Sequence, residues 1–205
     1  MNESVPVLAI DGPSGSGKGT LAAWMATELG WHLLDSGALY RLVAAMAVRQ
    51  GLDVDAEPTM QALAESLDIA FPDGKVLADG LDLTDEIRTE DIGVMASRVA
   101  ALPAVRSAIL QLQRDFAKAP GLVADGRDMG TVVFPHAGLK IFLDASAQAR
   151  AERRYNQLKN KGLSVSLRDL LEQIQERDAR DRERATAPLK PATDAMLIDS
   201  TQMTI

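Results

Sequence analysis

The chain has 205 residues, 46% of them hydrophobic, which is enough to bury one sizeable α/β core. It contains no cysteine, and this excludes disulfides and a thiolate nucleophile. Its formal net charge of −7 argues against a general nucleic-acid surface, because such a surface needs clustered lysines and arginines. Residues 1–4 lack the basic residues of a leader, and no apolar run has membrane-spanning length. We therefore expect a cytoplasmic protein that binds neither nucleic acid nor membrane.

A glycine-rich loop follows the first strand candidate, residues 7–10, and is the strongest signal in the sequence. The loop consists of Gly12, Pro13, Ser14, Gly15, Ser16, Gly17, Lys18, Gly19 and Thr20. Glycines let backbone amides curl around an anion, and the helix expected from Lys18 adds its positive end. The lysine ammonium can reach the β- and γ-phosphates of a nucleotide. We predict a phosphate-binding loop, the alternative being a turn that only joins strand to helix.

The position after the lysine departs from the usual phosphate-loop consensus. Gly19 stands where a serine or threonine is expected, and the hydroxyl arrives one residue later at Thr20. This variant resembles the loop of nucleoside monophosphate kinases more than that of GTPases or motor ATPases.

The next residues indicate a βαβ unit followed by an insertion whose hydrophobic pattern is that of short strands. Apolar spacing predicts a helix over 21–29 that ends at Gly30, then a strand over 31–35 and a helix over about 38–50. Between about residues 53 and 88, short alternating runs are separated by Pro-Asp-Gly and Asp-Gly turns. We expect a small antiparallel sheet there. Helical spacing resumes over 90–116, with Pro103 dividing it into two helices.

The remainder alternates strands with helices. Strands are expected at 122–125, 140–144 and 195–199, and helices at 148–161 and 166–184, the second starting at a serine cap. Parallel strands joined by right-handed helical crossovers give an α/β fold with a doubly wound sheet. In such a sheet the phosphate loop lies at the carboxyl ends of the strands.

Charged residues follow two of these strands. Asp125 ends one of them, and its carboxylate could hold Mg²⁺ through water. Arg127 can bind a phosphate with two parallel N–H donors. Asp144 ends the other and competes for the first role. The alternative for either aspartate is a cap of the following helix.

Two further groups could bind phosphate. Arg177, Asp181 and Arg184 share one helix face, although a solvated face with intrahelical ion pairs would have the same spacing. Ser36 precedes a helix whose N-terminus could receive an acceptor phosphate, with Arg41 one turn further on. Helix capping by Ser36 is the alternative.

With these segments in order, the chain resembles the bacterial cytidylate kinases over residues 5–201. The resemblance is carried by residues 12–20, 33–41, 124–135, 140–145 and 176–182. The loop indicates nucleoside monophosphate kinases broadly, whereas the Asp-Gly-Arg-Asp-Met-Gly-Thr-Val-Val-Phe-Pro block and the antiparallel insertion indicate this family. The resemblance implies that CMP or dCMP accepts the γ-phosphoryl group of ATP, with Mg²⁺ bound near Thr20 and Asp125.

The resemblance also implies roles for individual residues. Lys18, Arg127 and Arg177 would be catalytic. The acceptor phosphate would be held by Ser36, Arg41, Arg127 and Arg177, the sugar hydroxyls by Asp181 with Arg184 nearby, and the cytosine by Ser97, Arg106 and Asp128. A carboxylate such as Asp128 can accept from the exocyclic amine of cytosine. Arginines between residues 150 and 154 would sit in a lid over ATP.

One kinase domain is expected, with a core of about 1–35, 120–149 and 185–205. An acceptor-binding insertion would occupy about 36–119, and a short helical lid about 150–184. Relatives continue beyond the Asp-Ser-Thr segment into a terminal helix that this sequence, ending at Ile205, does not contain, so we expect a less stable last strand. We expect a monomer.

Two other functions are considered. The chain could phosphorylate another monophosphate, such as UMP or AMP, or it could be a non-catalytic P-loop protein that only binds nucleotide. A GTPase would need an Asn-Lys-x-Asp motif, but the Asn160-Lys161 pair is followed by Gly162 and Leu163.

Overall fold

The computed structural model describes residues 5–160 and 162–204. The described residues divide into two compact units, one within Met1–Leu34 and Phe116–Ile205 and the other within Asp35–Asp115. We call the first the sheet unit and the second the insertion unit.

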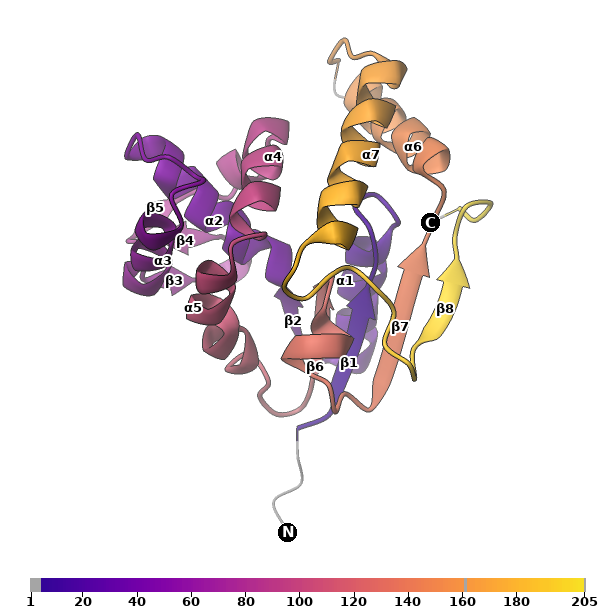
Figure 1. Ribbon diagram of the computed structural model, residues 1–205. Coiled ribbons are helices and arrows are strands. Elements are labelled where there is room, and N and C mark those ends of the chain that lie inside the picture. The colour runs from indigo at the N-terminus through magenta and orange to yellow at the C-terminus, as the bar shows by residue number, and fades with distance from the viewer. Residues whose placement is uncertain (1–4, 161, 205) are drawn as a thin grey trace. The chain divides into compact units, whose positions relative to one another are not determined.

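The sheet unit is built on a five-stranded sheet with the order β2-β6-β1-β7-β8 (Figure 1). Its strands are β1 (Val7–Asp11), β2 (His32–Asp35), β6 (Leu122–Gly126), β7 (Leu139–Asp144) and β8 (Met196–Asp199). β1 runs parallel to β6 and β7, and β7 runs parallel to β8. The predicted parallel α/β sheet is therefore confirmed, and β8 takes its place in it.

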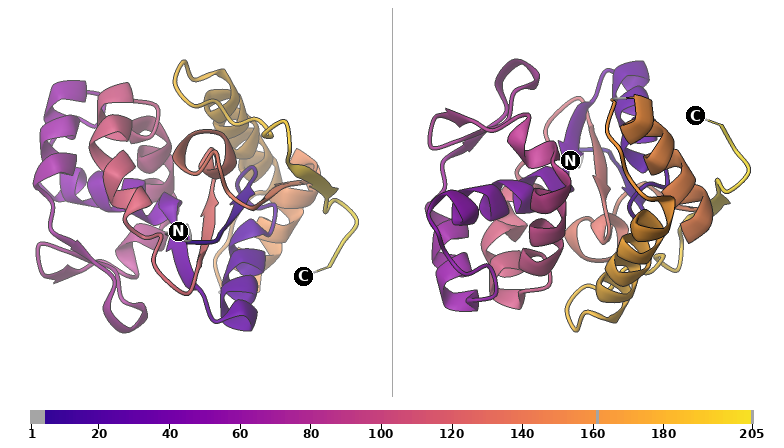
Figure 2. Two further views of the ribbon diagram at one scale, coloured as in Figure 1. Left: turned by 90° about the horizontal axis from the view of Figure 1, so that it is seen from below. Right: turned by 90° about the horizontal axis from the view of Figure 1, so that it is seen from above.

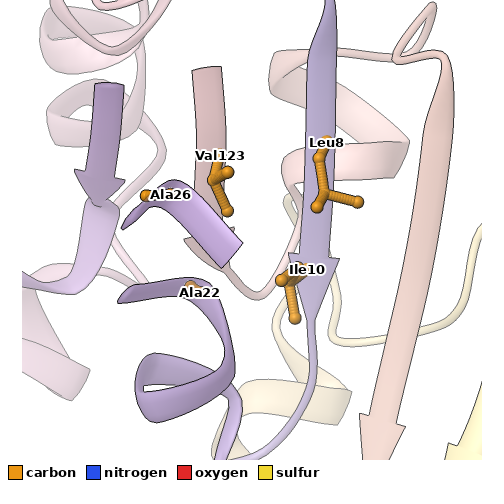
Figure 3. Packing of buried hydrophobic residues seen from close by; sticks show 5 residues of the cluster. All are labelled: Leu8, Ile10, Ala22, Ala26 and Val123. Carbon is orange, nitrogen blue, oxygen red and sulfur yellow. The ribbon is translucent and has the colours of Figure 1, made fainter. Parts of the chain in front are cut away.

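One face of this sheet is covered by α1 (Lys18–Leu29). Leu8 and Ile10 of β1 and Val123 of β6 pack against Ala22 and Ala26 of α1, and all five are buried (Figure 3). The two alanines let the helix approach closely to the sheet, and the buried apolar area stabilises the junction at about 25 cal/mol per Å². This packing fixes the start of α1 against the end of β1, where the glycine-rich loop lies.

Two helix ends in the sheet unit follow from local sequence. α1 ends at Gly30, whose φ of 64° is left-handed, as predicted. α6 (Ala147–Asn160) is the predicted arginine-rich helix, and Lys161, its expected last residue, lies outside the described residues. α7 (Leu167–Glu183) begins after Ser166, whose Oγ accepts a hydrogen bond from the Asp169 amide at 3.3 Å. α6 and α7 pack against each other, as the orange helices of Figure 2 show.

A π-helical turn over Met129–Val133, labelled η3, was not predicted. It directly follows Asp128, which lies two residues after the end of β6. Single π-helical turns are rare and occur frequently at functional sites, and the sequence pattern has no signal for the i to i+5 hydrogen bonding that defines them.

The insertion unit combines four helices with a small sheet among its described residues. The helices are α2 (Ser36–Arg49), α3 (Glu57–Ser66), α4 (Glu90–Val99) and α5 (Pro103–Arg114), with 3₁₀ turns at η1 (Pro72–Gly74) and η2 (Glu86–Arg88). The sheet has the order β3-β4-β5, formed antiparallel by β3 (Ile69–Ala70), β4 (Leu77–Ala78) and β5 (Leu81–Asp82). The antiparallel strands and the break at Pro103 are confirmed, whereas α3 was not predicted.

α2 forms the centre of this unit, because its residues from Leu42 to Ala47 are all buried. It packs against α4, while α3 packs against α5. None of the described helices is by itself long and apolar enough to cross a bilayer. α4 and α5 taken together satisfy length and composition, with a bend of 101° between them.

Candidate active site

The loop between β1 and α1 has the strand–loop–helix geometry that its glycines predict. Gly12 has a φ of 154°, and a Cβ there would lie 2.1 Å from the carbonyl oxygen of Leu143 in β7. Gly17 has a φ of 96° and precedes the first turn of α1 in the left-handed region. Any other residue at Gly12 would have to displace the backbone of β7, so this close approach requires glycine.

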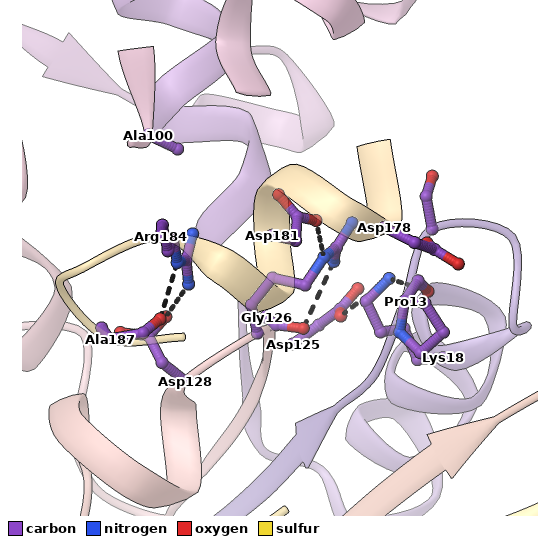
Figure 4. A network of polar contacts seen from close by, with 12 residues as sticks. Pro13, Lys18, Ala100, Asp125, Gly126, Asp128, Asp178, Asp181, Arg184 and Ala187 are labelled. Atoms are coloured by element: carbon purple, nitrogen blue, oxygen red, sulfur yellow. Dashed lines mark hydrogen bonds and ion pairs between the residues drawn. The ribbon is translucent and has the colours of Figure 1, made fainter. Parts of the chain in front are cut away.

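Lys18, the first residue of α1, folds back across the loop (Figure 4). Its Nζ donates to the carbonyl oxygen of Pro13 at 3.1 Å and lies 4.0 Å from Oδ1 of Asp125. The ammonium is thus held at the loop by a carbonyl on one side and a carboxylate from the end of β6 on the other. The amino end of α1 adds its positive field at the same place.

The structure explains why glycine follows the lysine. A Cβ at Gly19 would lie 3.2 Å from Oδ2 of Asp125, which is closer than most side-chain contacts. A serine or threonine there would therefore press on the carboxylate. The exposed Thr20 follows in the first turn of α1 and supplies the hydroxyl one residue later.

The two strand-ending aspartates that competed for one role have different surroundings. Asp125 is buried and lies beside Lys18. Asp144 has a half-exposed carboxylate that accepts from the amide of Ala145 at 2.9 Å and lies 3.7 Å from the guanidinium of Arg182. The geometry therefore favours Asp125 as the carboxylate at the loop.

Arg127 and the buried Asp181 form a partly buried ion pair between the end of β6 and α7. Nε of Arg127 donates to Oδ2 of Asp181 at 3.0 Å, and its Nη1 donates to the carbonyl of Gly126 at 3.3 Å (Figure 4). Burial raises the pKa of Asp181, but the attraction of Arg127, Arg177 and Arg184 outweighs it, so the pKa lies below its ordinary value. The carboxylate stays ionised within a cluster of three arginines.

Arg184 and Asp128 form a second pair in the same unit. Nη2 of Arg184 lies 3.8 Å from Oδ1 of Asp128, with both side chains 4% exposed, and Nε of Arg184 donates to the Ala187 carbonyl at 2.6 Å. The alternative of a solvated helix face is therefore wrong for Asp181 and Arg184, which are buried. Asp181 and Arg184 instead reach Arg127 and Asp128, which follow β6.

Asp11, the last residue of β1, is a buried carboxyl group that sequence reasoning missed. It accepts hydrogen bonds from the amides of Met129 and Gly130, both at 2.8 Å, and so holds the amino end of η3 beside Asp128. Burial raises the pKa of Asp11 to about 7, against the two amide bonds, which lower it. An aspartate ending the strand before the loop was the available signal, since Asp125 and Asp144 end strands in the same way.

The residues predicted for the acceptor lie partly in the insertion unit. Ser36 is buried at the start of α2, but the cap is Asp35, whose Oδ1 accepts from the amide of Ala38 at 3.2 Å. The capping alternative for Ser36 is therefore wrong. Nη1 of Arg41 donates to the carbonyls of Ile87 at 2.5 Å and Thr89 at 3.2 Å.

Ser97 and Arg106 are buried polar residues of α4 and α5 in the same unit. The guanidinium of Arg106 lies 5.5 Å from the ring centroid of Tyr40, a cation–π contact, and its Nη1 donates to the Ala100 carbonyl at 3.3 Å. Sequence reasoning did not single out Tyr40, although it precedes Arg41 directly. The ring orients Arg106 from α2.

The structure thus distributes the predicted residues between its units. The sheet unit holds the loop with Lys18, Asp125, Arg127, Asp128, Arg177, Asp181 and Arg184, and the insertion unit holds Ser36, Arg41, Ser97 and Arg106. Across residues 5–160 and 162–204, no three histidine, aspartate or glutamate side chains gather as a metal site would require.

Comparison with known proteins gives consistent matches over the whole chain. The family model described as cytidylate kinase matches residues 8–205. A cytidylate kinase of Pseudomonas aeruginosa (strain LESB58) is 62% identical over 211 residues, which cover 100% of this chain and 92% of the relative. That of Photobacterium profundum is 57% identical over 209 residues, with 100% and 92% covered. That of Aeromonas hydrophila subsp. hydrophila is 56% identical, with 100% and 91% covered. The crystal structure of TT1252 from Thermus thermophilus aligns at a TM-score of 0.46 and 17% identity, over 97% of this chain and 90% of that one.

Proposed function

Because the chain belongs to the cytidylate kinase family, we propose that it transfers the γ-phosphoryl group of ATP to CMP or dCMP, giving CDP or dCDP. The observation that carries this proposal is the position of Lys18. Its ammonium donates to the carbonyl oxygen of Pro13 and lies beside the carboxylate of Asp125. It is thus held at a loop whose glycines allow the backbone to enclose an anion. A lysine so held can follow the charge of the β- and γ-phosphates as it shifts during transfer.

The residues around the loop fit Mg²⁺ bound mainly by phosphate and water. Mg²⁺ usually keeps several waters and takes one or two carboxylates, in agreement with the lack of a larger acidic cluster among the described residues. The buried Asp125 carboxylate would hold the ion through water, and the hydroxyl of Thr20 would contact it. When bound, Mg²⁺ neutralises charge on the phosphate oxygens.

Arg127 and Arg177 would bind the acceptor phosphate. Phosphoryl transfer depends on cations that are already positioned around the reacting oxygens. Asp181 fixes the guanidinium of Arg127 through the 3.0 Å bond and would also contact the sugar hydroxyls. In the insertion unit, Ser36 and Arg41 would contribute to binding the same phosphate.

Cytosine would be recognised by Asp128, Ser97 and Arg106. The carboxylate of Asp128 accepts from the exocyclic amine, while the hydroxyl and the guanidinium can donate to the ring acceptors. Arg184 supports this role from the sheet unit because it lies 3.8 Å from Asp128 and can hold that carboxylate in place. Tyr40 does the same for Arg106 in the insertion unit.

We propose a role for each of three parts of the chain. The core of about 1–35, 120–149 and 185–205 would bind the ATP phosphates, the insertion of about 36–119 would bind the acceptor, and residues of about 150–184 would form the lid. We further propose that the enzyme works as a monomer in the cytoplasm. Light scattering during size-exclusion chromatography tests the oligomeric state.

The proposed reaction is tested by ADP release from ATP with a panel of acceptors, namely CMP, dCMP, UMP and AMP, at equal Mg²⁺ and salt. We expect the highest kcat/KM with CMP or dCMP. A higher value with UMP or AMP would reassign the acceptor. Tight ATP binding without ADP release for any acceptor would indicate a non-catalytic nucleotide-binding protein.

A further inference from the structure

The carbonyl groups of the phosphate loop are held by two arginines of α6. A loop that turns its amides inward to an anion turns carbonyls outward, and outward carbonyls in a buried position need donors. Nη1 of Arg150 donates to the carbonyl of Ser14 at 3.0 Å, and Nη1 of Arg153 donates to the carbonyl of Ser16 at 3.4 Å. Arg150 and Arg153 are three positions apart and therefore project from neighbouring turns of one helix face.

Arg150 is bound to the protein in several directions. Its side chain is 2% exposed, and its Nε donates to the carbonyl of Ala145 at 2.9 Å. Its guanidinium also forms a two-pronged pair with Asp178 of α7, through Nη1 to Oδ1 at 3.0 Å and through Nη2 to Oδ2. Arg150 therefore links the turn after β7, the phosphate loop and α7.

The backbone of the loop comes close to Arg150 at one residue. A Cβ added to Gly15 would lie 3.3 Å from the Cβ of Arg150, and the φ of 79° at this glycine is left-handed. The glycine thus lets the loop lie directly against α6. The hydrogen bond from Arg150 to Ser14 therefore depends on the backbone conformation at Gly15.

Arg153 makes a second attachment that involves no carboxylate. Its Nη1 lies 3.3 Å from Oγ of Ser200, and its Nη2 donates to the carbonyls of Ser200 and, at 3.1 Å, Met203. Oγ of Ser200 donates in turn to the same Ser16 carbonyl at 2.9 Å. The segment after β8 and α6 therefore meet at one carbonyl of the loop.

We propose that Arg150 and Arg153 are positioning residues for the phosphate loop, which they hold by its carbonyl groups so that its amides stay directed at the phosphates of ATP. Their guanidinium donors are engaged with protein oxygens, so their role differs from that of a lid arginine that contacts ATP. The charge of Arg150 is offset by Asp178, and the charge of Arg153 behind the loop strengthens the attraction of the loop for an anion. This inference rests on the proposed binding of ATP by the loop.

Two variants with different side effects test the inference. Arg153→Met removes the second attachment and leaves no carboxylate unpaired. Arg150→Met alone would leave Asp178 without its partner, so it is combined with Asp178→Leu to remove the pair as a unit. Arg168→Met on α7 is the matched control, because Arg168 is exposed and pairs with Glu172 one turn away on its own helix.

The measurements are the Kd of MgATP by calorimetry without acceptor, the separate KM values for ATP and CMP, and a thermal melt of each full-length variant. We expect about tenfold weaker MgATP binding for Arg153→Met and for the double variant, because small displacements of positioned groups have large effects. For Arg153→Met the KM for CMP should stay within about twofold of wild type. General destabilisation would not weaken MgATP binding while leaving the KM for CMP unchanged. Arg153→Lys, which keeps the positive charge and one donor nitrogen, should recover part of the loss, and Arg168→Met should match wild type.

The inference is overturned if both variants, assayed well below their melting temperatures, bind MgATP within about twofold of wild type. Equal losses for ATP and CMP in Arg153→Met would also overturn it. Failure of the wild-type chain to bind MgATP would instead refute the proposed function, so the two failures are distinguishable.

Discussion

Three ion pairs of the sheet unit, Arg127–Asp181, Arg184–Asp128 and Arg150–Asp178, are largely buried, whereas Arg98–Asp55 and Lys75–Asp82 of the insertion unit lie at the surface. Arg184–Asp128 and Arg150–Asp178 have side chains at most 15% exposed, while Arg98–Asp55 and Lys75–Asp82 have side chains at least 39% exposed. Exposed pairs contribute little to stability, because water and salt screen them. A buried pair costs more in desolvation and often adds no net stability.

This difference indicates what the buried charges are for. Fixed charges in a dry site act strongly on a charged ligand and need no reorganisation during reaction. The sheet unit therefore resembles a preorganised anion site, and the ion pairs of the insertion unit resemble ordinary surface contacts. Substitutions in the two units should separate these roles.

The largest effect is expected for Lys18→Ala. Turnover should fall on the order of hundredfold or more with little change in the melting temperature, because no other residue follows the charge of the transferring phosphoryl group from the loop. Lys75→Ala, which removes the lysine of an exposed pair in the insertion unit, is the control and should keep wild-type turnover. Turnover of Lys18→Ala within about threefold of wild type would refute the phosphate-loop mechanism.

Arg127→Ala and Arg177→Ala should each lower kcat/KM by about hundredfold, since each removes a positioned cation from the acceptor phosphate. The loss should be the same whether CMP or UMP is offered, because neither arginine is proposed to touch the base. The assay compares both acceptors at one salt and Mg²⁺ concentration. Losses that differ by more than about tenfold between the acceptors would reassign an arginine to the base or sugar.

Asp128→Asn should weaken the selection of cytosine over uracil. The substitution keeps the size of the side chain but replaces an acceptor with a donor, so CMP should lose about 1.5 to 3 kcal/mol in kcat/KM. UMP, which has a carbonyl in place of the amine, should lose less or gain. The readout is the CMP to UMP ratio of kcat/KM in wild type and variant. An unchanged ratio would leave recognition to Ser97 and Arg106.

The stability of the fold should also depend on pH, with opposite signs for Asp11 in the sheet unit and Asp55 in the insertion unit. Burial raises the pKa of Asp11 in the folded state from 3.8 to about 7. Between these two pH values the folded protein therefore binds a proton that the unfolded protein lacks. The stability of wild type relative to Asp11→Asn should therefore fall as the pH rises from about 4 to about 7.

Asp55 provides the opposite case. Its hydrogen bond with Arg98 lowers its pKa, so the stability it contributes is present above its unfolded pKa and is lost as the pH falls through the folded pKa. Melting temperatures of wild type, Asp11→Asn and Asp55→Asn are therefore measured from well below pH 4, where the Asp55 contribution is lost, up to about pH 7, where the Asp11 contribution is lost. If the melting temperature of wild type instead rises relative to that of Asp11→Asn as the pH rises, the two amide bonds outweigh the effect of burial on the pKa.

Local signals in the sequence predicted much of the fold. The glycines of the loop, Gly30 at the end of α1 and Ser166 at the start of α7 act within a few residues of their own position, so their effects can be read from the sequence. The same holds for the turns of the antiparallel sheet and for Pro103. α3 was missed because it lay inside a segment whose turn signals indicated strands.

The sequence by itself determined the phosphate loop, the parallel sheet and the family, because each depends on periodicity, caps or contiguous motifs. Only the tertiary structure decided that Asp125 and not Asp144 lies beside Lys18, and that α7 buries Asp181 and Arg184. It also decided the attachments of Asp11 to Met129 and of Arg150 to Ser14, which join residues 118 and 136 positions apart. Such contacts depend on which strands become neighbours and on which carbonyls lose water in the packed chain, and no local pattern records either.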